Sequence, residues 1–465
     1  MRGGAFAPQS RDLDSARLTM QAVAPPRRPF HIGPRAEIAN DAPAQPELTS
    51  SARSSVARIA ALCAFGAVCF GLLVSRRPEV LTQPQFYAED GQAWYANAHN
   101  LGLISVMTPV GGYLNSFQRL VGLSTAPLGL VDAARTMAVI ALAVQTLPAL
   151  FFASRRLCNV VADDRARLGI ALLYIIIPNP ELTANLTNTQ WHLAALAFLV
   201  IVAAPPRSRT GRAFDILVLA LSALSGPFAI FLLPIAIARY RHELRGWRLC
   251  EIGLLGTAMA IQFAILAFTA HSTPRSALTL GASPTLVPPI IANQLLARFT
   301  AHAVAPSDLA ITSCIALAVV VTITVGLLHA ERELRYFAAL AVAIVVTGLL
   351  LPYSNPYVHQ QDATAWAAIA TGGAANRYFF LTSVLLVIAV VKLAVGLSHS
   401  RWSGALAIIA VIGATIVASL PTWQYTPLSE EHLARYQTLI DGAKSGSIIT
   451  IPIDPPGWTM QVKAG

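Results

Sequence analysis

Long apolar runs separated by short polar stretches recur along the chain from residue 56 onward. The first run, 56–75, suits a helix that crosses a bilayer, because a helix rises about 1.5 Å per residue and the hydrocarbon layer is roughly 30 Å thick. The later runs are 134–153, 167–181, 190–204, 213–224, 228–238, 249–269, 309–329, 335–351, 378–397 and 402–420. This pattern predicts an all-α polytopic membrane protein with about 11 transmembrane helices.

Two of these runs, 213–224 and 228–238, are short and are separated only by Ser225-Gly226-Pro227. One interpretation is a single helix kinked at Pro227, because proline removes a backbone donor and clashes with the preceding turn. Arginines on both sides of the pair favour a short or re-entrant hairpin instead, with both ends in the cytoplasm. These are Arg207, Arg209 and Arg212 before the pair, and Arg239, Arg241, Arg245 and Arg248 after it.

The polar stretches divide the chain into three parts. Residues 1–55 mix Pro, Ala, Ser and Arg without periodicity, which predicts a disordered cytoplasmic tail. Residues 56–420 form the transmembrane domain, and residues 421–465 are expected to form a small cap outside the membrane.

The expected cap begins with a helix that Ser429 caps at its N-terminus, and Leu433, Tyr436 and Ile440 form one face of that helix. A short strand over Ser447–Ile451 follows. We expect the cap to rest on the loops of the membrane domain.

Composition excludes an ordinary soluble domain, because 55% of the 465 residues are hydrophobic and only 12% are charged. The net charge of +10 does not predict a nucleic-acid partner, since most basic residues lie in short runs between apolar stretches, where they orient helices. Among the 33 basic residues only Lys392, Lys444 and Lys463 are lysines. That bias is typical of a GC-rich bacterial genome, so we expect a bacterial inner membrane protein.

Charge also predicts the orientation. Arginines precede the first run and Arg58 lies in its first turn, which places the N-terminus in the cytoplasm. The long loops 76–133, 270–308 and 352–377 and the C-terminus are then external. We therefore expect the functional surface to face outward.

The first external loop contains an acidic pair, Glu89 and Asp90, within the stretch Gln85–Gln92. Carboxylates so close to a bilayer are costly to keep, which indicates a function. A loop carboxylate can act as a general base that takes the proton of an acceptor hydroxyl while this hydroxyl attacks a sugar carbon. The alternative is that both are solvated loop residues that cap a helix beginning at Gln92.

Arginines on the external side break the orientation rule. The planar guanidinium binds phosphate through two hydrogen bonds, so misplaced arginines suggest an anionic lipid or a phosphate ligand. For any single one, a side chain that reaches to the membrane interface is the commoner explanation. The residues are Arg119, Arg135, Arg275, Arg298 and Arg377, and Arg377 at the start of a late span is the strongest candidate.

Two further polar segments belong to the external side. Thr108–Asn115 contains Gly111-Gly112, which suits either close approach to a ligand or a plain turn, and it leads into an interfacial helix expected over Phe117–Val131. Asn179–His192 offers amides and an indole ring for a sugar, although a solvated hairpin loop is the commoner structure. The candidate substrate-binding residues are Tyr87, Tyr113, Asn188, Gln190, Trp191 and His192.

No cysteine or histidine has the spacing of a metal site, and no nucleotide-binding glycine loop or nucleophile elbow occurs in the sequence. A divalent cation held by Glu89 and Asp90 is the metal site that the sequence allows, because Mg²⁺ and Mn²⁺ prefer oxygen ligands. The sequence therefore does not establish whether a metal is bound or which one it is.

This layout resembles that of the GT-C fold glycosyltransferases, over most of residues 56–465. The shared features are an acidic motif in the first external loop, an interfacial helix after it, about eleven spans, an Arg-Tyr pair at Arg377 and an external C-terminal cap. Enzymes of this superfamily are integral membrane proteins that use polyprenyl-phosphate-linked sugars. Some branches carry Asp-x-Asp or Asp-Asp where this chain has Glu-Asp, which leaves metal dependence open.

The resemblance implies a membrane glycosyltransferase that moves a sugar to a glycan, lipid or protein acceptor on the outer face of the membrane. Asp90 would be the catalytic base, with Glu89 assisting it or holding a metal. The donor phosphate would be bound by arginines, namely Arg377, Arg119 and Arg298.

Two other classes of protein remain as alternatives. A transporter or flippase of a lipid-linked or anionic solute would also place arginines near broken helices, but such proteins commonly show internal repeats, and none is clear here. A non-catalytic assembly or sensing protein would leave the two carboxylates without a cavity.

Overall fold

The computed structural model describes residues 47–269, 281–297, 303–328, 330–350, 362–398, 400–427 and 433–465. The chain divides into residues 1–55 and a second unit, Val56–Gly465, which carries the fold and the site. Arg275, Arg298 and the predicted cap residue Ser429 lie outside the described residues, as does most of the predicted N-terminal tail.

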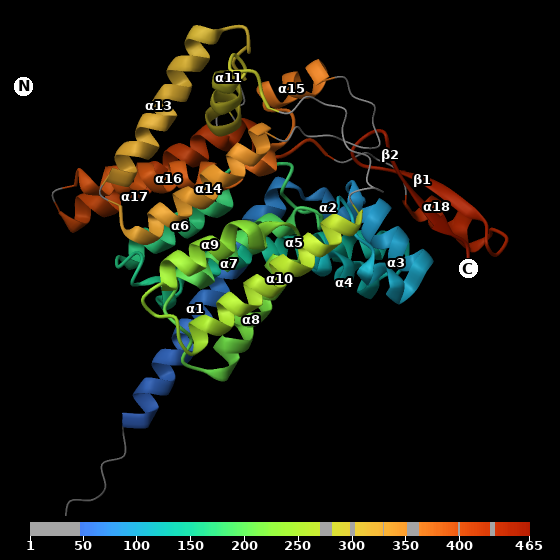
Figure 1. Ribbon diagram of the computed structural model, residues 1–465, viewed down its shortest axis with the longest axis horizontal. Coiled ribbons are helices and arrows are strands. Elements are labelled where there is room, and N and C mark those ends of the chain that lie inside the picture. The colour runs from blue at the N-terminus through green and yellow to red at the C-terminus, as the bar shows by residue number, and fades with distance from the viewer. Residues whose placement is uncertain are drawn as a thin grey trace, which may run out of the picture. The chain divides into compact units, whose positions relative to one another are not determined.

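The second unit is built almost entirely of helices (Figure 1). Among the described residues, seven helices are long and apolar enough to cross a membrane. They are α1 (Glu47–Arg76, apolar from Ala57), α5 (Leu130–Ala153), α10 (Trp247–Thr269), α13 (Leu309–Leu328), α14 (Arg332–Leu350), α16 (Phe380–Gly396) and α17 (Arg401–Ser419). The prediction of an all-α polytopic membrane protein is confirmed.

The other four predicted spans are also helical but shorter, at 13 to 16 residues. They are α6 (Asp164–Ile176), α7 (Thr189–Val202), α8 (Arg209–Leu224) and α9 (Phe228–Tyr240). The count of eleven membrane crossings stays a prediction.

Burial separates the central helices from the peripheral ones. In the apolar segments of α5 and α16, 61% and 67% of the residues are buried, whereas in α1, α10, α13 and α17 the share is 11% to 22%. The main core is formed by the central helices, where Leu142, Ala171, Leu196, Leu232 and Leu385 are at most 1% exposed. The peripheral helices therefore present apolar side chains outward, as lipid contact requires.

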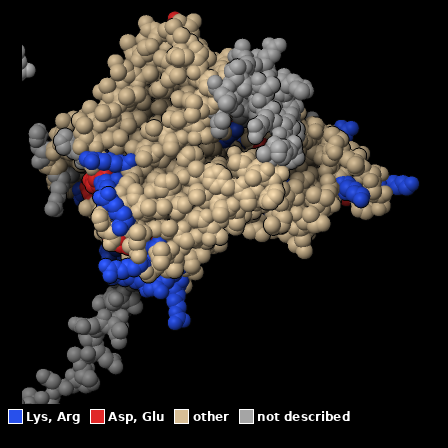
Figure 2. Space-filling view, viewed as in Figure 1, with Lys and Arg blue, Asp and Glu red and all other residues tan. Residues whose placement is uncertain are grey.

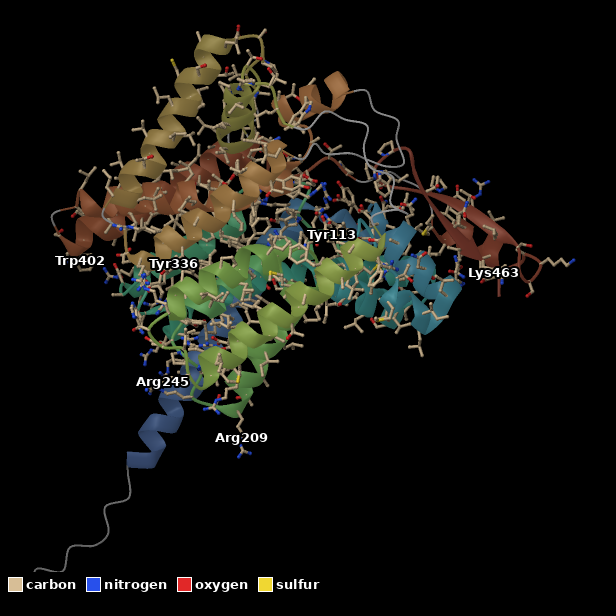
Figure 3. All side chains as sticks on the ribbon, in the orientation of Figure 1. Tyr113, Arg209, Arg245, Tyr336, Trp402 and Lys463 are labelled. Carbon is tan, nitrogen blue, oxygen red and sulfur yellow. The ribbon has the colours of Figure 1, made fainter. Side chains whose placement is uncertain are left out.

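The chain turns at two ends of the bundle. At one end, which we term the basic end, arginines tie the turns together: Arg156 donates to the Ala204 carbonyl at 3.1 Å and Arg248 to the Ala203 carbonyl at 3.0 Å. Figure 2 shows Lys and Arg gathered at this end, while much of the visible surface beyond it is uncharged. In Figure 3, Arg209, Arg245 and Trp402 lie on this side and Lys463 lies on the other.

The interpretation of 213–238 as two helices in a hairpin, in place of one kinked helix, is confirmed, and the cytoplasmic position of their ends stays a prediction. The two helices are separate, and Gly226 between them has a φ of 134°, a value that favours glycine. Their outer ends both meet the start of α10 at the basic end: the Arg212 guanidinium of α8 lies 5.7 Å from the centre of the Trp247 ring, and Arg248 donates to the Tyr240 hydroxyl at the end of α9 at 3.0 Å.

The opposite end, which we term the cap end, carries the first long loop. Its short helices are α2 (Glu79–Thr82), a π-helical turn (Asp90–Tyr95), α3 (Ala96–Leu101), a 3₁₀ turn (Gly102–Met107) and α4 (Ser116–Thr125). The prediction of one helix over Phe117–Val131 is wrong: α4 ends at Thr125 and α5 begins at Leu130. Pro127 lies between them and has no backbone N–H for a continuous helix.

The C-terminal cap consists of α18 (Leu433–Asp441) and an antiparallel hairpin of β1 (Ile448–Ile453) and β2 (Trp458–Lys463). The predicted helix face is confirmed, since Leu433 and Ile440 are buried and Tyr436 packs against the same cluster. The strand predicted over Ser447–Ile451 is confirmed as β1, whereas β2 was missed. Alternate side chains of β2 are buried, so one face of the hairpin packs on the first loop.

The remaining helices, α11 (Val287–Ala292) and α15 (Asp362–Ala370), lie next to α13 and α16 in a third, smaller core cluster. Asn293 joins them, because its amide donates to the carbonyls of Val304 and Ala370 at 2.9 and 2.7 Å.

Candidate active site

Three segments that are far apart in the sequence meet at the cap end. They are the start of the π-helical turn at Glu89 and Asp90, the loop 177–188 between α6 and α7, and the 3₁₀ turn Asn376–Phe379 that leads into α16. Asp90 binds the second segment directly, and Arg377 of the third segment binds it as well. The loop 177–188 is therefore the link between the acidic pair and the arginine.

Asp90 is fixed by three hydrogen bonds. Its Oδ1 accepts the Thr187 N–H at 2.7 Å and the Thr187 hydroxyl at 2.6 Å, and its Oδ2 accepts the Leu186 N–H at 2.8 Å. The Thr187 hydroxyl in turn accepts the indole N–H of Trp94 at 2.9 Å. Only 4% of Asp90 is exposed, so the carboxylate holds the loop in place and has no open side toward a substrate.

Burial raises the pKa of Asp90 to about 7, although the hydrogen bonds from Thr187 and Leu186 oppose this rise. The neighbouring carboxylate of Glu89 adds a smaller upward contribution to that pKa. The three donors therefore favour the carboxylate form of Asp90, whereas burial and the charge of Glu89 favour its protonated form.

Glu89 differs from its neighbour because it is only half-buried. Burial raises its pKa, the positive charge of Arg377 lowers it, and the negative charge of Glu181 raises it. Glu89, Glu181 and Arg377 therefore lie within electrostatic reach of one another.

Arg377 is held by Glu181 through its backbone and its side chain. The Arg377 N–H donates to Glu181 Oε2 at 3.1 Å, and Arg377 Nη1 forms an ion pair with Glu181 Oε1. The guanidinium also lies over the ring of Tyr378, 5.2 Å from its centre. Ala375, two residues earlier, has a φ of 58°, and such strained backbone is often found at functional sites.

A cavity of about 470 Å³ lies beside this ion pair. Pro180 and Asn376, the chain neighbours of Glu181 and Arg377, are among its lining residues. Polar groups from other elements also line it, namely Arg77, Asn293, Gln424 and Tyr425. The cavity joins the end of α1, the loop 177–188, the start of α16 and the segment after α17.

Arg77 is a functional candidate that the sequence reasoning missed. It is 5% exposed, its Nη1 donates to the Thr183 carbonyl at 3.4 Å, and its Nε is 3.7 Å from Glu79 Oε1. The guanidinium also lies 5.5 Å from the centre of the Tyr425 ring. The signal was present in the sequence, because Arg77 follows the first span on the predicted external side and breaks the orientation rule there.

Glu181 was missed for a different reason. It lies both at the end of the apolar run 167–181 and inside the polar segment Asn179–His192, where only Asn188, Gln190, Trp191 and His192 are predicted to bind substrate. In the structure α6 ends at Ile176 and leaves Glu181 in the loop. The loop folds back on itself, since the Glu181 carbonyl accepts the amides of Asn185 and Asn188 at 2.7 and 2.8 Å.

The predicted substrate residues of α7 lie inside the fold. Asn188 is 3% exposed and uses its amide on Glu181, and His192 is 1% exposed with Nδ1 2.7 Å from the Tyr174 hydroxyl. Trp191 packs edge-on against Tyr378, with 5.3 Å between the ring centres. Gln190 is half-buried, and its Oε1 lies where a side chain at Gly226 would be.

The predicted aromatic residues of the first loop flank the site. Tyr113 is half-buried; burial raises its pKa and Tyr378 adds to the rise, so the two hydroxyl groups lie within electrostatic reach of each other. Tyr113 lies centrally in Figure 3, between the bundle and the cap. Tyr87 is also half-buried and pairs through its backbone with Asp454 of the cap.

The other predicted phosphate-binding arginines occupy different places. Arg119 is 1% exposed, donates to the Ala93 carbonyl at 2.8 Å and stacks on Trp94 at 4.9 Å, and burial lowers its pKa to about 10. These contacts tie α4 to the turn that carries Asp90. Arg135 pairs with Asp132 at 2.9 Å on α5, and Arg298 lies outside the described residues.

The described residues contain no group of three or more histidine, cysteine, aspartate or glutamate side chains that could hold a metal ion. Both oxygens of Asp90 already accept hydrogen bonds from N–H or O–H donors. The donor set of Asp90 therefore does not fit a divalent cation held between Glu89 and Asp90.

No protein family model, curated protein or solved structure matches this chain. The fold defines a multi-pass helical membrane protein, and its function is inferred from the site alone.

Proposed function

We propose that this protein is a membrane glycosyltransferase that moves a sugar from a polyprenyl-phosphate donor to an acceptor hydroxyl on the outer face of a bacterial inner membrane. The observation that supports it is the meeting of a half-buried carboxylate, Glu89, with the Arg377–Glu181 ion pair beside a polar cavity. Such a combination offers a base and a phosphate-binding cation in one place.

Glu89 is the proposed catalytic base. A general base must lie within hydrogen-bond reach of the proton that it removes, and Glu89 is the more exposed member of the acidic pair. Asp90 is the positioning residue, because its two oxygens hold Leu186 and Thr187. The family resemblance implies Asp90 as the base and Glu89 as its helper, and the present proposal reverses these two roles.

Arg77 and Arg377 are the proposed phosphate ligands. Arg77 lines the cavity directly after α1, and Arg377 follows the lining residue Asn376 in the turn before α16. A guanidinium binds phosphate through paired hydrogen bonds. Asn293, Asn376 and Gln424 supply amides around the same space, which suit the hydroxyl groups of a sugar.

The proposed reaction is a single displacement. The acceptor oxygen forms a bond to the anomeric carbon while its proton passes to the Glu89 carboxylate. The bond between that carbon and the phosphate oxygen breaks, and its electron pair leaves with the phosphate. The positive charge of Arg77 and Arg377 stabilises the negative charge that develops on this leaving group.

The orientation belongs to the same proposal. Arginines gather at the basic end of the bundle, and positively charged turns normally stay in the cytoplasm. The cap end with Glu89 and Arg377 would then face outward, where lipid-linked sugars meet acceptors.

The test is transfer from labelled polyprenyl-phosphate sugars by the purified protein in lipid vesicles. We expect Glu89→Gln to lower the rate about 10²–10⁴-fold, the usual contribution of a general base, while donor binding persists. Asp90→Asn should lower thermal stability together with the rate, because an amide group replaces an oxygen that accepts an N–H.

The matched control is Asp132→Asn, which changes an exposed aspartate on α5 that forms an ion pair with Arg135, away from the acidic pair. It should transfer sugar at the original rate. Full activity of Glu89→Gln would refute the assignment of the base, and no transfer from any lipid-linked sugar by the unchanged protein would refute the proposed class.

A further inference from the structure

A second cavity, of about 490 Å³, lies inside the bundle and shares no lining residue with the cavity at the cap end. Its walls are apolar side chains of α5, α6, α7, α14 and α16, among them Phe152, Ile170, Phe198, Phe337 and Ile388. A volume of this size is within the roughly 300–1,000 Å³ range of small-molecule sites.

The charged residues of this cavity lie at one side, while the Tyr174 hydroxyl, deeper in the wall, is hydrogen-bonded to His192. The charged residues are Asp163 before α6, Glu331 and Glu333 at the start of α14, and Lys392 near the end of α16. Val384 also lines the cavity and lies about 12 Å from Lys392 along the helix axis, at 1.5 Å per residue. The cavity is therefore an apolar pocket that runs from a charged rim into the bundle.

The rim faces the basic end. Lys392 is ion-paired with Glu331, and Arg239 lies 3.4 Å from Glu333. Asp163 caps α6 by accepting the Arg165 N–H at 2.9 Å. Each rim carboxylate is thus engaged by a cation or an N–H, while the Lys392 ammonium has two further N–H donors. Arg165, Arg332 and Arg335 on the adjoining helix starts add positive charge.

The surroundings indicate where an occupant would come from. Three of the lining helices, α5, α14 and α16, are long and apolar enough to cross a membrane. An apolar pocket along such helices excludes ions and sugars, because it offers them no hydrogen bonds. It suits a hydrocarbon chain, and the Lys392 ammonium at the rim, together with the arginines on the adjoining helix starts, suits a phosphate at the end of that chain.

We propose that this pocket binds an anionic phospholipid, with one acyl chain between α5, α6 and α16 and its phosphate at Lys392. The lipid fills space between helices whose side chains would otherwise lack packing partners. This site is independent of the proposed transferase activity, because the two cavities have no residue in common.

The test uses the full-length protein purified in detergent, with bound lipid extracted and counted by mass spectrometry after washing. We expect the unchanged protein to retain an anionic phospholipid and Lys392→Gln to retain at least tenfold less. Lys444→Gln is the matched control, since Lys444 is exposed and lies at the cap end, and it should retain the same amount as the unchanged protein.

A second variant tests the acyl-chain part of the pocket. Ala195→Phe places a ring where Ala195 of α7 lines the cavity, and it should abolish lipid retention. Added phosphatidylglycerol should raise the unfolding temperature of the unchanged protein but not that of Ala195→Phe, and inorganic phosphate alone should raise neither.

Equal retention in the unchanged protein and in Lys392→Gln would overturn the proposal, as would equal retention of zwitterionic and anionic lipids. If Ala195→Phe does not fold, the comparison of Lys392→Gln with Lys444→Gln decides the outcome, because Lys392 is at the rim and its loss leaves the apolar walls intact.

Discussion

The charge next to a carboxylate decides how easily that carboxylate gives up its proton. For Glu89, burial raises the pKa above the ordinary glutamate value of about 4.3, Arg377 lowers it and Glu181 raises it. If Glu89 is the base, its carboxylate form is the active one. Activity should then fall on the acidic side with the pKa of Glu89 rather than with that of an exposed glutamate.

Neutral substitutions of Arg377 and Glu181 should move the acidic limb of the pH–rate profile in opposite directions. Arg377→Gln removes the charge that favours the carboxylate, so the limb of kcat/KM should shift to higher pH. Glu181→Gln removes a negative charge, so the limb should shift to lower pH. Pre-steady-state transfer measured across a pH series checks both.

Arg135→Gln serves as the control, because Arg135 contacts Asp132 and the Leu81 carbonyl instead of the acidic pair. If the acidic limb of kcat/KM stays at the same pH in all three variants, a group other than Glu89 controls that limb.

Contacts between the short elements of the first loop set the position of the acidic pair. A Cβ added to Gly122 of α4 would lie 2.4 Å from the Trp94 carbonyl oxygen, which is backbone and cannot move aside alone. The close approach of α4 to the π-helical turn is therefore possible only with glycine at this position. Arg119, one helical turn earlier, reinforces the same contact through Ala93.

Gly122→Ala should therefore destabilise the protein by about 1–3 kcal/mol, the usual cost of overpacking, and should lower activity by displacing Glu89. Gly71→Ala in α1 is the matched control, since nothing lies within 4 Å of its added Cβ and alanine favours helices. Thermal unfolding in detergent checks both variants. An unfolding temperature for Gly122→Ala equal to that of Gly71→Ala would contradict the close contact.

The sequence predicts the long helices well, but it predicts the short helices and strands only in part. Runs of about 20 apolar residues leave little choice but a membrane helix, so the seven long helices match their predicted ranges closely. The break after α4 depends on Pro127. The strand β2 was missed although Trp458, Met460 and Val462 alternate with polar residues, which is the period of a half-buried strand. Its pairing partner β1 is set by the fold of the cap.

The site itself could be predicted only at the residues with unusual chemistry. Glu89, Asp90 and Arg377 stand out because charge is rare in this chain. The sequence could not predict that Asp90 is the buried, positioning carboxylate and Glu89 the more exposed one. The hydrogen bonds from Leu186 and Thr187 that hold Asp90 come from a loop about 100 residues away in sequence. Glu181, the partner of Arg377, was hidden at the end of an apolar run.

The arrangement of the whole molecule places its two cavities toward opposite ends. A transporter would need a route between them, but the cavities have no lining residue in common, and the packed main core contains Leu196, Leu232 and Leu385. This separation supports an enzyme whose chemistry is confined to one side of the membrane.

The orientation of these ends can be measured with thiol reagents. Cys158 is exposed near Arg155 and Arg156 at the basic end, and Lys444 is exposed in the cap. A membrane-impermeant maleimide should label Lys444→Cys in intact cells, whereas Cys158 should react only after the membrane is made permeable. Labelling of Cys158 in intact cells would reverse the proposed orientation.

The packing of the cap on Gly91 also bears on how the protein is made. A Cβ at Gly91 would lie 2.9 Å from Ile453 and 3.0 Å from the sulfur of Met460, so the hairpin rests directly on the residue after Asp90. The ribosome produces the acidic pair long before it produces this hairpin. The loop that carries Glu89 therefore lacks its final support until nearly all helices have entered the membrane. A nascent chain interrupted before β1 would carry Glu89 in an incomplete site.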